Sequence, residues 1–287
     1  MPPETLARRA VRSFDGTELA AWASPPRDGA GTVLLLGPLG ADLAAWRHQI
    51  AYLAPRYRVV AWDLRGLGAS RAPPDPAALD VADHARDAAA VLADLAIARC
   101  AVLAWGEGAQ IALDLAHRAP SVTTHLALVC PRWSGRFARA LGVHAESSLP
   151  LFGARALAPT RRALARLGAP LAIAKRLGLV AASLDAELYD EVAARKRELD
   201  PTSLSAIARA LGRHRDAPRP ESLTMPVLVA CGTRDSASHV LEARRLGRRL
   251  PFGELFVIDG ASAWAPLEYP DLLNLRVEKF LDRNGFG

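Results

Sequence analysis

The chain has 287 residues and carries 36 Lys and Arg side chains against 30 Asp and Glu, a formal net charge of +6. Hydrophobic residues make up 51% of the chain, which excludes an intrinsically disordered protein and allows a full core to be buried. No apolar run reaches the roughly 18 residues of a membrane span, and the first ten residues lack the apolar core of a secretory signal, so we expect neither membrane association nor secretion.

The pattern of apolar residues predicts strands and helices that alternate along the chain. Runs at 10–14 and 18–23, separated by Asp15-Gly16-Thr17, predict a β-hairpin. Short apolar runs that end at Gly, Pro or Asp predict strands buried on both faces at 32–36, 58–62, 101–104, 125–130, 227–231 and 254–258. Apolar residues spaced three and four apart predict helices at 44–53, 81–95, 110–119, 240–250 and 272–281. This alternation indicates an α/β fold with a mostly parallel sheet.

The alternation stops at Pro131 and resumes at Met225. Helical patches at 161–167, 171–177, 186–197 and 204–211 lie between these points and predict an inserted helical cap. We therefore expect a core over 1–130 and 223–287, with the cap over 131–222. The cap segment holds 16 basic and 9 acidic side chains, a net charge of +7, so it contains the basic excess of the whole chain. Such a cap either guides an anionic ligand toward a cleft or is an Arg-rich solvated lid.

Three short segments follow predicted strands, where open α/β sheets place their ligands. The first is Gly-Pro-Leu-Gly at 37–40, followed by Asp42 and Trp46. The second is Asp-Leu-Arg-Gly-Leu-Gly-Ala-Ser at 63–70. The third, Ala-Trp-Gly-Glu-Gly-Ala at 104–109, joins a strand to a helix. Its small residues predict a tight turn that projects the middle residue, Gly106, above the sheet.

With these motifs the chain resembles the α/β-hydrolase family over nearly its whole length, and most of all the 3-oxoadipate enol-lactonase-like branch. The loop at 38–46 and the run at 63–70 carry this resemblance, together with the order of strands, turn and cap. It implies an α/β-hydrolase fold with an inserted helical cap, in which a Ser nucleophile, a His base and an Asp act together.

Only one of those three side chains is present at the matching position. Asp235, in the turn after the cap, falls on the Asp of the family. The nucleophile position falls on Gly106 and the base position on Ala263. A glycine cannot form an acyl-enzyme, and an alanine cannot accept a proton from a hydroxyl or from water. We therefore expect no serine-hydrolase turnover. Natural substitutions explain both positions better than an engineered knockout, for which Ser to Ala alone would be usual.

The resemblance also places the backbone N–H groups of Leu39 and Glu107 where the family binds a substrate oxygen. Glu107 and Asp235 are the candidate acid and base, although Glu107 also suits a helix start and Asp235 also suits a structural carboxylate. Further pocket candidates are Trp105, Arg132, Trp133, His144, His239 and Trp264. Core packing explains the tryptophans as well as a pocket role does, and a solvated side chain is the favoured interpretation of Arg132, His144 and His239. No cluster with metal-ligand spacing is present, and we expect no metal, cofactor or nucleic-acid partner.

Three functions remain open. The first is a repurposed, cofactor-free enzyme for a small carbonyl-containing metabolite, with cyclisation, isomerisation, elimination or decarboxylation as its reaction and a role in secondary-metabolite biosynthesis. The second is a non-catalytic protein that uses the cleft between core and cap as a ligand receptor, or its surface as a scaffold. The third is hydrolysis with relocated residues. Three cysteines, Cys100, Cys130 and Cys231, are too few for a disulfide framework and favour the cytoplasm. A filled or collapsed cleft would favour a scaffold, and a closed, dry pocket with ionisable groups aimed inward would favour the enzyme.

Overall fold

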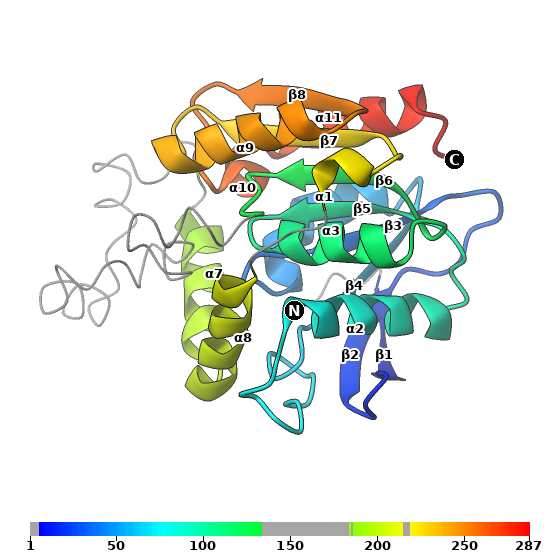
Figure 1. Cartoon of the computed structure of the whole chain (residues 1–287), viewed down its shortest axis with the longest axis vertical. Helices are drawn as coiled ribbons and strands as arrows, with labels where there is room; N and C mark the ends of the chain where they lie inside the picture. Colours follow the sequence, from blue (N-terminus) through cyan, green and yellow to red (C-terminus); the bar gives the residue numbers. More distant parts are fainter. Residues whose placement is uncertain (1–5, 134–183, 185, 215–218) are drawn as a thin grey trace, which may run out of the picture.

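The computed structural model describes residues 6–133, 184, 186–214 and 219–287, and it contains one eight-stranded sheet (Figure 1). The strand order is β1-β2-β4-β3-β5-β6-β7-β8. The strands β1 and β2 pair antiparallel, as do β2 and β4, and the rest of the sheet is parallel. The bounds are β1 Ala7–Arg12, β2 Glu18–Ala23, β3 Thr32–Leu36, β4 Arg58–Trp62, β5 Cys100–Trp105, β6 Thr123–Val129, β7 Val227–Gly232 and β8 Gly253–Ile258. This is the α/β-hydrolase arrangement that the sequence predicts.

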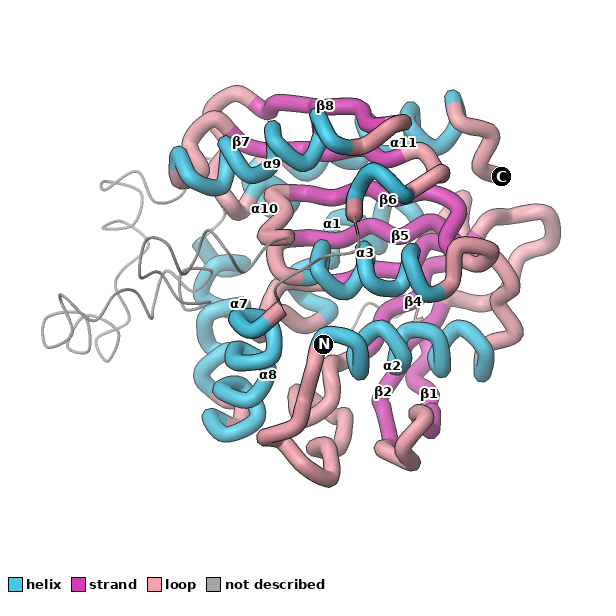
Figure 2. Tube along the Cα trace, viewed as in Figure 1, coloured by secondary structure: helices cyan, strands magenta, loops and turns pink. Residues whose placement is uncertain are grey.

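Helices cover both faces of the sheet (Figures 1 and 2). On one face lie α2 (Val81–Asp94), α3 (Gly108–Arg118) and α9 (Ala237–Arg249), and on the other lie α1 (Arg47–Leu53) and α11 (Pro270–Arg283). The short helices are η1 (Leu43–Trp46), η4 (Pro220–Ser222) and α10 (Ala265–Glu268). Because each central strand has helices on both sides, β3, β5 and β7 are buried at every position, as parallel strands require.

Two of the predicted strands differ from the structure. The first strand of the hairpin lies at Ala7–Arg12 rather than at 10–14, because residues 13–17 form the turn. The last strand was expected to be buried on both faces, and that expectation is wrong. As the end strand of the sheet, β8 lacks a neighbour on one side. Its residues alternate between exposed and half-buried up to Val257, and only Ile258 is buried.

The described part of the cap contains α7 (Ala186–Arg197) and α8 (Pro201–Arg213), both close to the predicted patches. Asp200 caps α8 by accepting hydrogen bonds from the N–H groups of its first turn. Ion pairs join α7 to the core: Glu191 pairs with Arg47, and Arg195 lies 2.6 Å from Asp42. The predicted patches at 161–167 and 171–177 lie outside the described residues.

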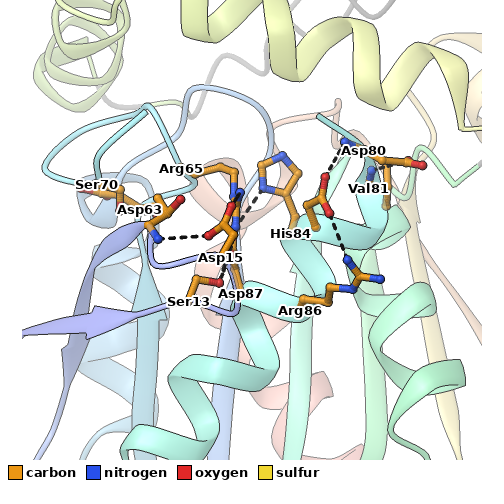
Figure 3. A network of polar contacts seen from close by, with 12 residues as sticks. Ser13, Asp15, Asp63, Arg65, Ser70, Asp80, Val81, His84, Arg86 and Asp87 are labelled. Atoms are coloured by element: carbon orange, nitrogen blue, oxygen red, sulfur yellow. Dashed lines mark hydrogen bonds and ion pairs between the residues drawn. The ribbon is translucent and has the colours of Figure 1, made fainter. Parts of the chain in front are cut away.

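A buried ion network fastens the loop after β4 to α2 (Figure 3). The Arg65 side chain is 2% exposed and contacts both carboxylate oxygens of Asp87, with its Nε 2.8 Å from Oδ2. Asp15 pairs with Arg65 at 2.7 Å. His84 lies beside this network, with its Nδ1 3.8 Å from Oδ2 of Asp87 (Figure 3). Its ring nitrogens make no hydrogen bond in the described structure. Burial, together with the Arg65 charge, lowers the pKa of His84 to about 3.

Candidate functional site

The turn between β5 and α3 has a defined backbone geometry. Gly106 adopts φ +60°, in the left-handed region that favours glycine. Its N–H donates to the Val129 carbonyl at 3.0 Å, and its carbonyl accepts from the Arg132 N–H at 3.0 Å. At Gly108, a Cβ would lie 2.3 Å from the Leu36 carbonyl oxygen, so only glycine fits where α3 starts. The turn is therefore held by its backbone and by neighbouring strand ends.

Pro38 covers the point from which a side chain at position 106 would project. A Cβ built on Gly106 would lie 2.9 Å from Cβ of Pro38, closer than such carbons approach in proteins. Any side chain at this position therefore requires the loop of Pro38 to move. The resemblance assigns the nucleophile to this same position.

The loop after β8 brings Ala263 to the end of β5. The Trp105 indole N–H donates to the Ala263 carbonyl at 2.7 Å. The carboxylate of Glu268 accepts hydrogen bonds from both the N–H and the hydroxyl of Ser262, each at 2.7 Å, which fixes the loop on its other side. The structure thus brings together Gly106 and Ala263, which line one cavity.

That cavity is small. Its volume is about 20 Å³, which is room for about one water molecule. The Trp105 ring meets Trp46 and Trp264 edge to face, with centroid distances of 5.9 and 6.0 Å. Val192 of α7 closes the cavity from the cap side. The lining residues are Pro38, Ala41, Ala45, Trp105, Gly106, Arg132, Val192, Ala263 and Trp264.

Beside the cavity, a carboxylate accepts a hydrogen bond from a backbone N–H group. The Leu39 N–H donates to Oε2 of Glu107 at 3.4 Å, and the Glu107 side chain is buried. Oε1 of the same carboxylate lies 3.6 Å from Nε of Arg132. The backbone group that the resemblance assigns to the substrate oxygen therefore already faces a negatively charged oxygen of the protein.

A second charged cluster forms where α9 begins. Asp235 and His239 lie one helical turn apart, with 3.4 Å between Oδ1 and Nδ1. Burial opposes the charge on Asp235, but the hydrogen bond from His239 and the Arg132 charge outweigh it and lower the pKa of the carboxyl. The Ser236 hydroxyl lies 2.6 Å from the same Nδ1, while Nη1 of Arg132 lies 2.5 Å from Nε2. A catalytic triad needs the Ser and the Asp on different ring nitrogens, so this cluster does not have triad geometry.

The remaining predicted residues lie apart from the cavity or outside the described structure. Trp133 packs under Arg249 and donates its indole N–H to the Glu242 carbonyl at 3.1 Å. Burial raises the pKa of both the Cys130 and Cys231 thiols, so neither is an activated nucleophile. His144 lies outside the described residues.

Sequence reasoning did not identify three residues that shape the site: Pro38, Val192 and Ser236. Pro38 and Val192 act through contacts between segments far apart in the chain, which no local pattern shows. Ser236 could have been found, because a Ser immediately before a predicted helix is the signature of an N-cap, and its hydroxyl accepts from the His239 N–H.

Within the described residues, no group of three His, Cys, Asp or Glu side chains could hold a metal ion. Among the helices of the same residues, none is both long and apolar enough to cross a membrane.

Comparisons with known proteins agree with the architecture. The family model described as "alpha/beta hydrolase fold" matches residues 31–270. An uncharacterised protein of Mycobacterium tuberculosis is 26% identical over 294 residues, which cover 98% of this chain and 82% of that protein. The enol-lactonase of Burkholderia xenovorans superposes with a TM-score of 0.74 at 23% identity, over 96% of this chain and all of that one. An esterase from Rhodococcus superposes with a TM-score of 0.71 at 25% identity, over 97% of this chain and 99% of that one.

Proposed function

Because the chain belongs to the α/β-hydrolase fold family, we propose that it is a member without serine-hydrolase turnover that acts by binding, as a receptor or scaffold. One observation carries this proposal: Cβ of Pro38 lies 2.9 Å from the place where a side chain at Gly106 would begin. The turn therefore has no nucleophilic side chain, and Pro38 obstructs any side chain at that position. The base is missing too, because Ala263 has no ionisable group.

The oxyanion donors support the same conclusion. A substrate oxyanion at the Leu39 N–H would have to displace the Glu107 carboxylate or sit beside it. An oxyanion and a carboxylate that both lie against one backbone N–H group repel each other strongly in a buried site. The donor that stabilises a tetrahedral intermediate in hydrolases is therefore engaged within the protein itself.

The size of the cavity supports the scaffold in preference to both a receptor for a small molecule and turnover of a metabolite in the cleft. A volume of about 20 Å³ is far below the roughly 300 Å³ at which small-molecule sites begin. The aromatic rings of Trp46, Trp105 and Trp264 fill the space beside it. The three free, buried cysteines support a reducing compartment, which we propose to be the cytoplasm.

A second candidate, the non-hydrolytic enzyme, is favoured by one other observation. A series of side-chain contacts lies next to the cavity: Glu107 contacts Arg132, Arg132 contacts His239, and His239 contacts Asp235. If the cavity widens around a ligand, these side chains supply an acid, a base and a cation for proton transfer or decarboxylation of a small carbonyl compound.

Serine-directed labelling tests the proposal. Incubation with a fluorophosphonate, followed by intact-mass measurement, should show no adduct, and a panel of esters should show no burst. A stoichiometric adduct on any serine, Ser236 included, would overturn it.

A separate measurement distinguishes the two candidates. Small enol and keto acids are screened by thermal shift, and each stabilising compound is then followed by proton NMR. Stabilisation without chemical change supports the binding protein. Chemical change that is lost in Glu107→Gln supports the enzyme.

A further inference from the structure

The exposed apolar side chains gather along one edge of the molecule. Seven large apolar residues are exposed in the described structure, and six of them lie on α9, β8, α11 or the turn before β8. These six are Leu241, Phe252, Leu255, Val257, Leu272 and Leu275. Phe252 is the most exposed, at 60%. Such a concentration on one edge marks an interaction surface better than single exposed residues do.

The two edges of the sheet differ in their protection. The β1 edge exposes Arg8, Arg9 and Arg12, and such charges prevent further strands from pairing. The β8 edge has one charged residue, Glu254, which pairs with Arg276 and Arg283 of α11. Because β8 pairs only with β7, its outer backbone groups have no strand partner in the described structure. Figure 1 shows β8 as the outermost strand, flanked by α9 and α11.

A row of arginines lies on the exposed face of α9, the helix that packs against β8. One exposed stripe runs along α9. It begins at Leu241 and continues through the residues three, four and seven positions later, which are Arg244, Arg245 and Arg248. Leu255 lies against the helix at Gly247, between the positions of Arg244 and Arg248. In the described residues, no carboxylate pairs with Arg244 or Arg248. The edge therefore combines free backbone groups, apolar side chains and unneutralised positive charge.

We propose that the β8 edge binds an extended, acidic segment of a partner protein, which adds a strand to the sheet. Its backbone pairs with β8, its apolar side chains cover Leu255 and Val257, and its carboxylates meet Arg244 and Arg248. Lipid cannot satisfy the strand's backbone donors and acceptors, which argues against a membrane as the occupant. A second copy paired through β8 would place the arginine stripe of one α9 against the other, where like charges repel. The proposal does not depend on the function proposed above, because the edge is separate from the cavity.

The test uses the full chain and a capped peptide of six residues, the length of β8, in which Val alternates with Glu. Hydrogen exchange measured by mass spectrometry should slow about tenfold over Gly253–Ile258 when the peptide is present at about 1 mM. The same peptide with Lys in place of Glu should have no effect.

Two variants locate the effect on this edge. Val257→Glu gives β8 a charge of the same sign as the peptide's carboxylates, and it should abolish the slowing. Its control, Ala10→Glu on the exposed β1 strand, should leave the slowing intact. A combined Arg244→Gln and Arg248→Gln variant, which leaves β8 unchanged, should weaken binding about tenfold.

Other outcomes overturn the proposal. No slowing at this concentration, or equal slowing by the Lys peptide, excludes an acidic strand. Protection of β8 that rises with protein concentration alone, with dimer mass by light scattering, assigns the edge to a second copy. Co-sedimentation with phosphatidylglycerol vesicles, without a response to the peptide, assigns it to lipid.

Discussion

The Leu39 N–H donates to the Glu107 carboxylate, and that carboxylate lies 3.6 Å from Nε of Arg132, so the carboxylate contacts a backbone donor on one side and a guanidinium on the other. Glu107→Gln keeps an oxygen for Leu39 but removes the charge that faces Arg132. A double-mutant cycle with Arg132→Gln, measured by urea unfolding, should give a coupling free energy of about 1–3 kcal/mol. The exposed pair Arg249 and Glu221 is the control and should give a much smaller coupling free energy, because solvent screens it. Additive effects at Glu107 and Arg132 would show that the contact is not coupled.

Gly106→Ala should destabilise the protein more than Gly16→Ala. Both glycines have positive φ, so both substitutions cost about 1 kcal/mol through the backbone. A Cβ at Gly16 meets nothing within 4 Å, whereas at Gly106 it meets Pro38. The free energy of unfolding should therefore fall by about 1–3 kcal/mol more at Gly106. Equal losses would mean that the Pro38 loop moves aside freely.

Restoring the hydrolase residues should fail until Pro38 changes. A Gly106→Ser and Ala263→His variant should remain unlabelled by a fluorophosphonate, since Pro38 blocks the serine. Adding Pro38→Gly removes the obstructing carbon and should allow labelling. Pro38→Ala removes the ring but keeps that carbon, so this matched variant should stay unlabelled. Labelling of the double variant would contradict the steric argument.

His84 should make the native state sensitive to acid. Its pKa is about 3 when folded and about 6.5 when unfolded, so its contribution to stability is present above pH 6.5 and is lost as the pH falls toward 3. When the pH is lowered from 7 to 5, the free energy of unfolding, measured in urea, should fall by about 2 kcal/mol more for the wild type than for His84→Leu. The exposed His117→Leu is the control for loss of an imidazole. Parallel pH curves for wild type and His84→Leu would contradict this origin.

Asp63 should make the native state less stable as the pH rises, the reverse of the effect of His84. Burial raises its pKa to about 6, despite the hydrogen bond from the Ala69 N–H at 2.8 Å. The folded state therefore holds a proton that the unfolded state releases near pH 4, and stability falls as the pH rises from about 4 to 6. Above pH 6, Asp63→Asn should be about 1–3 kcal/mol more stable than wild type, with the difference vanishing near pH 4. The exposed turn residue Asp75, changed to Asn, should show no such trend.

The sequence predicts the strands better than it predicts their surroundings. The bounds of β3 and β4 match the predicted ranges because apolar runs between turn residues are local signals. The exposure of β8 could not be predicted, because an apolar run does not show that its strand ends the sheet. In the site, Gly106, Ala263 and Asp235 were located from motifs. The positions of Pro38 over Gly106 and of Glu107 on Leu39 depend on how two loops meet, and no spacing along the chain encodes that distance.

The turn at Gly106 keeps its shape through backbone hydrogen bonds, and the Trp105 indole holds the loop at Ala263, so neither depends on a reactive side chain. Under the proposed function, a lineage could therefore discard the nucleophile and the base with little loss of stability, and selection on folding would not oppose it. Under the same proposal, a serine that returned to position 106 on its own would meet Pro38 and destabilise the fold, so recovery of a nucleophile would need changes in both loops.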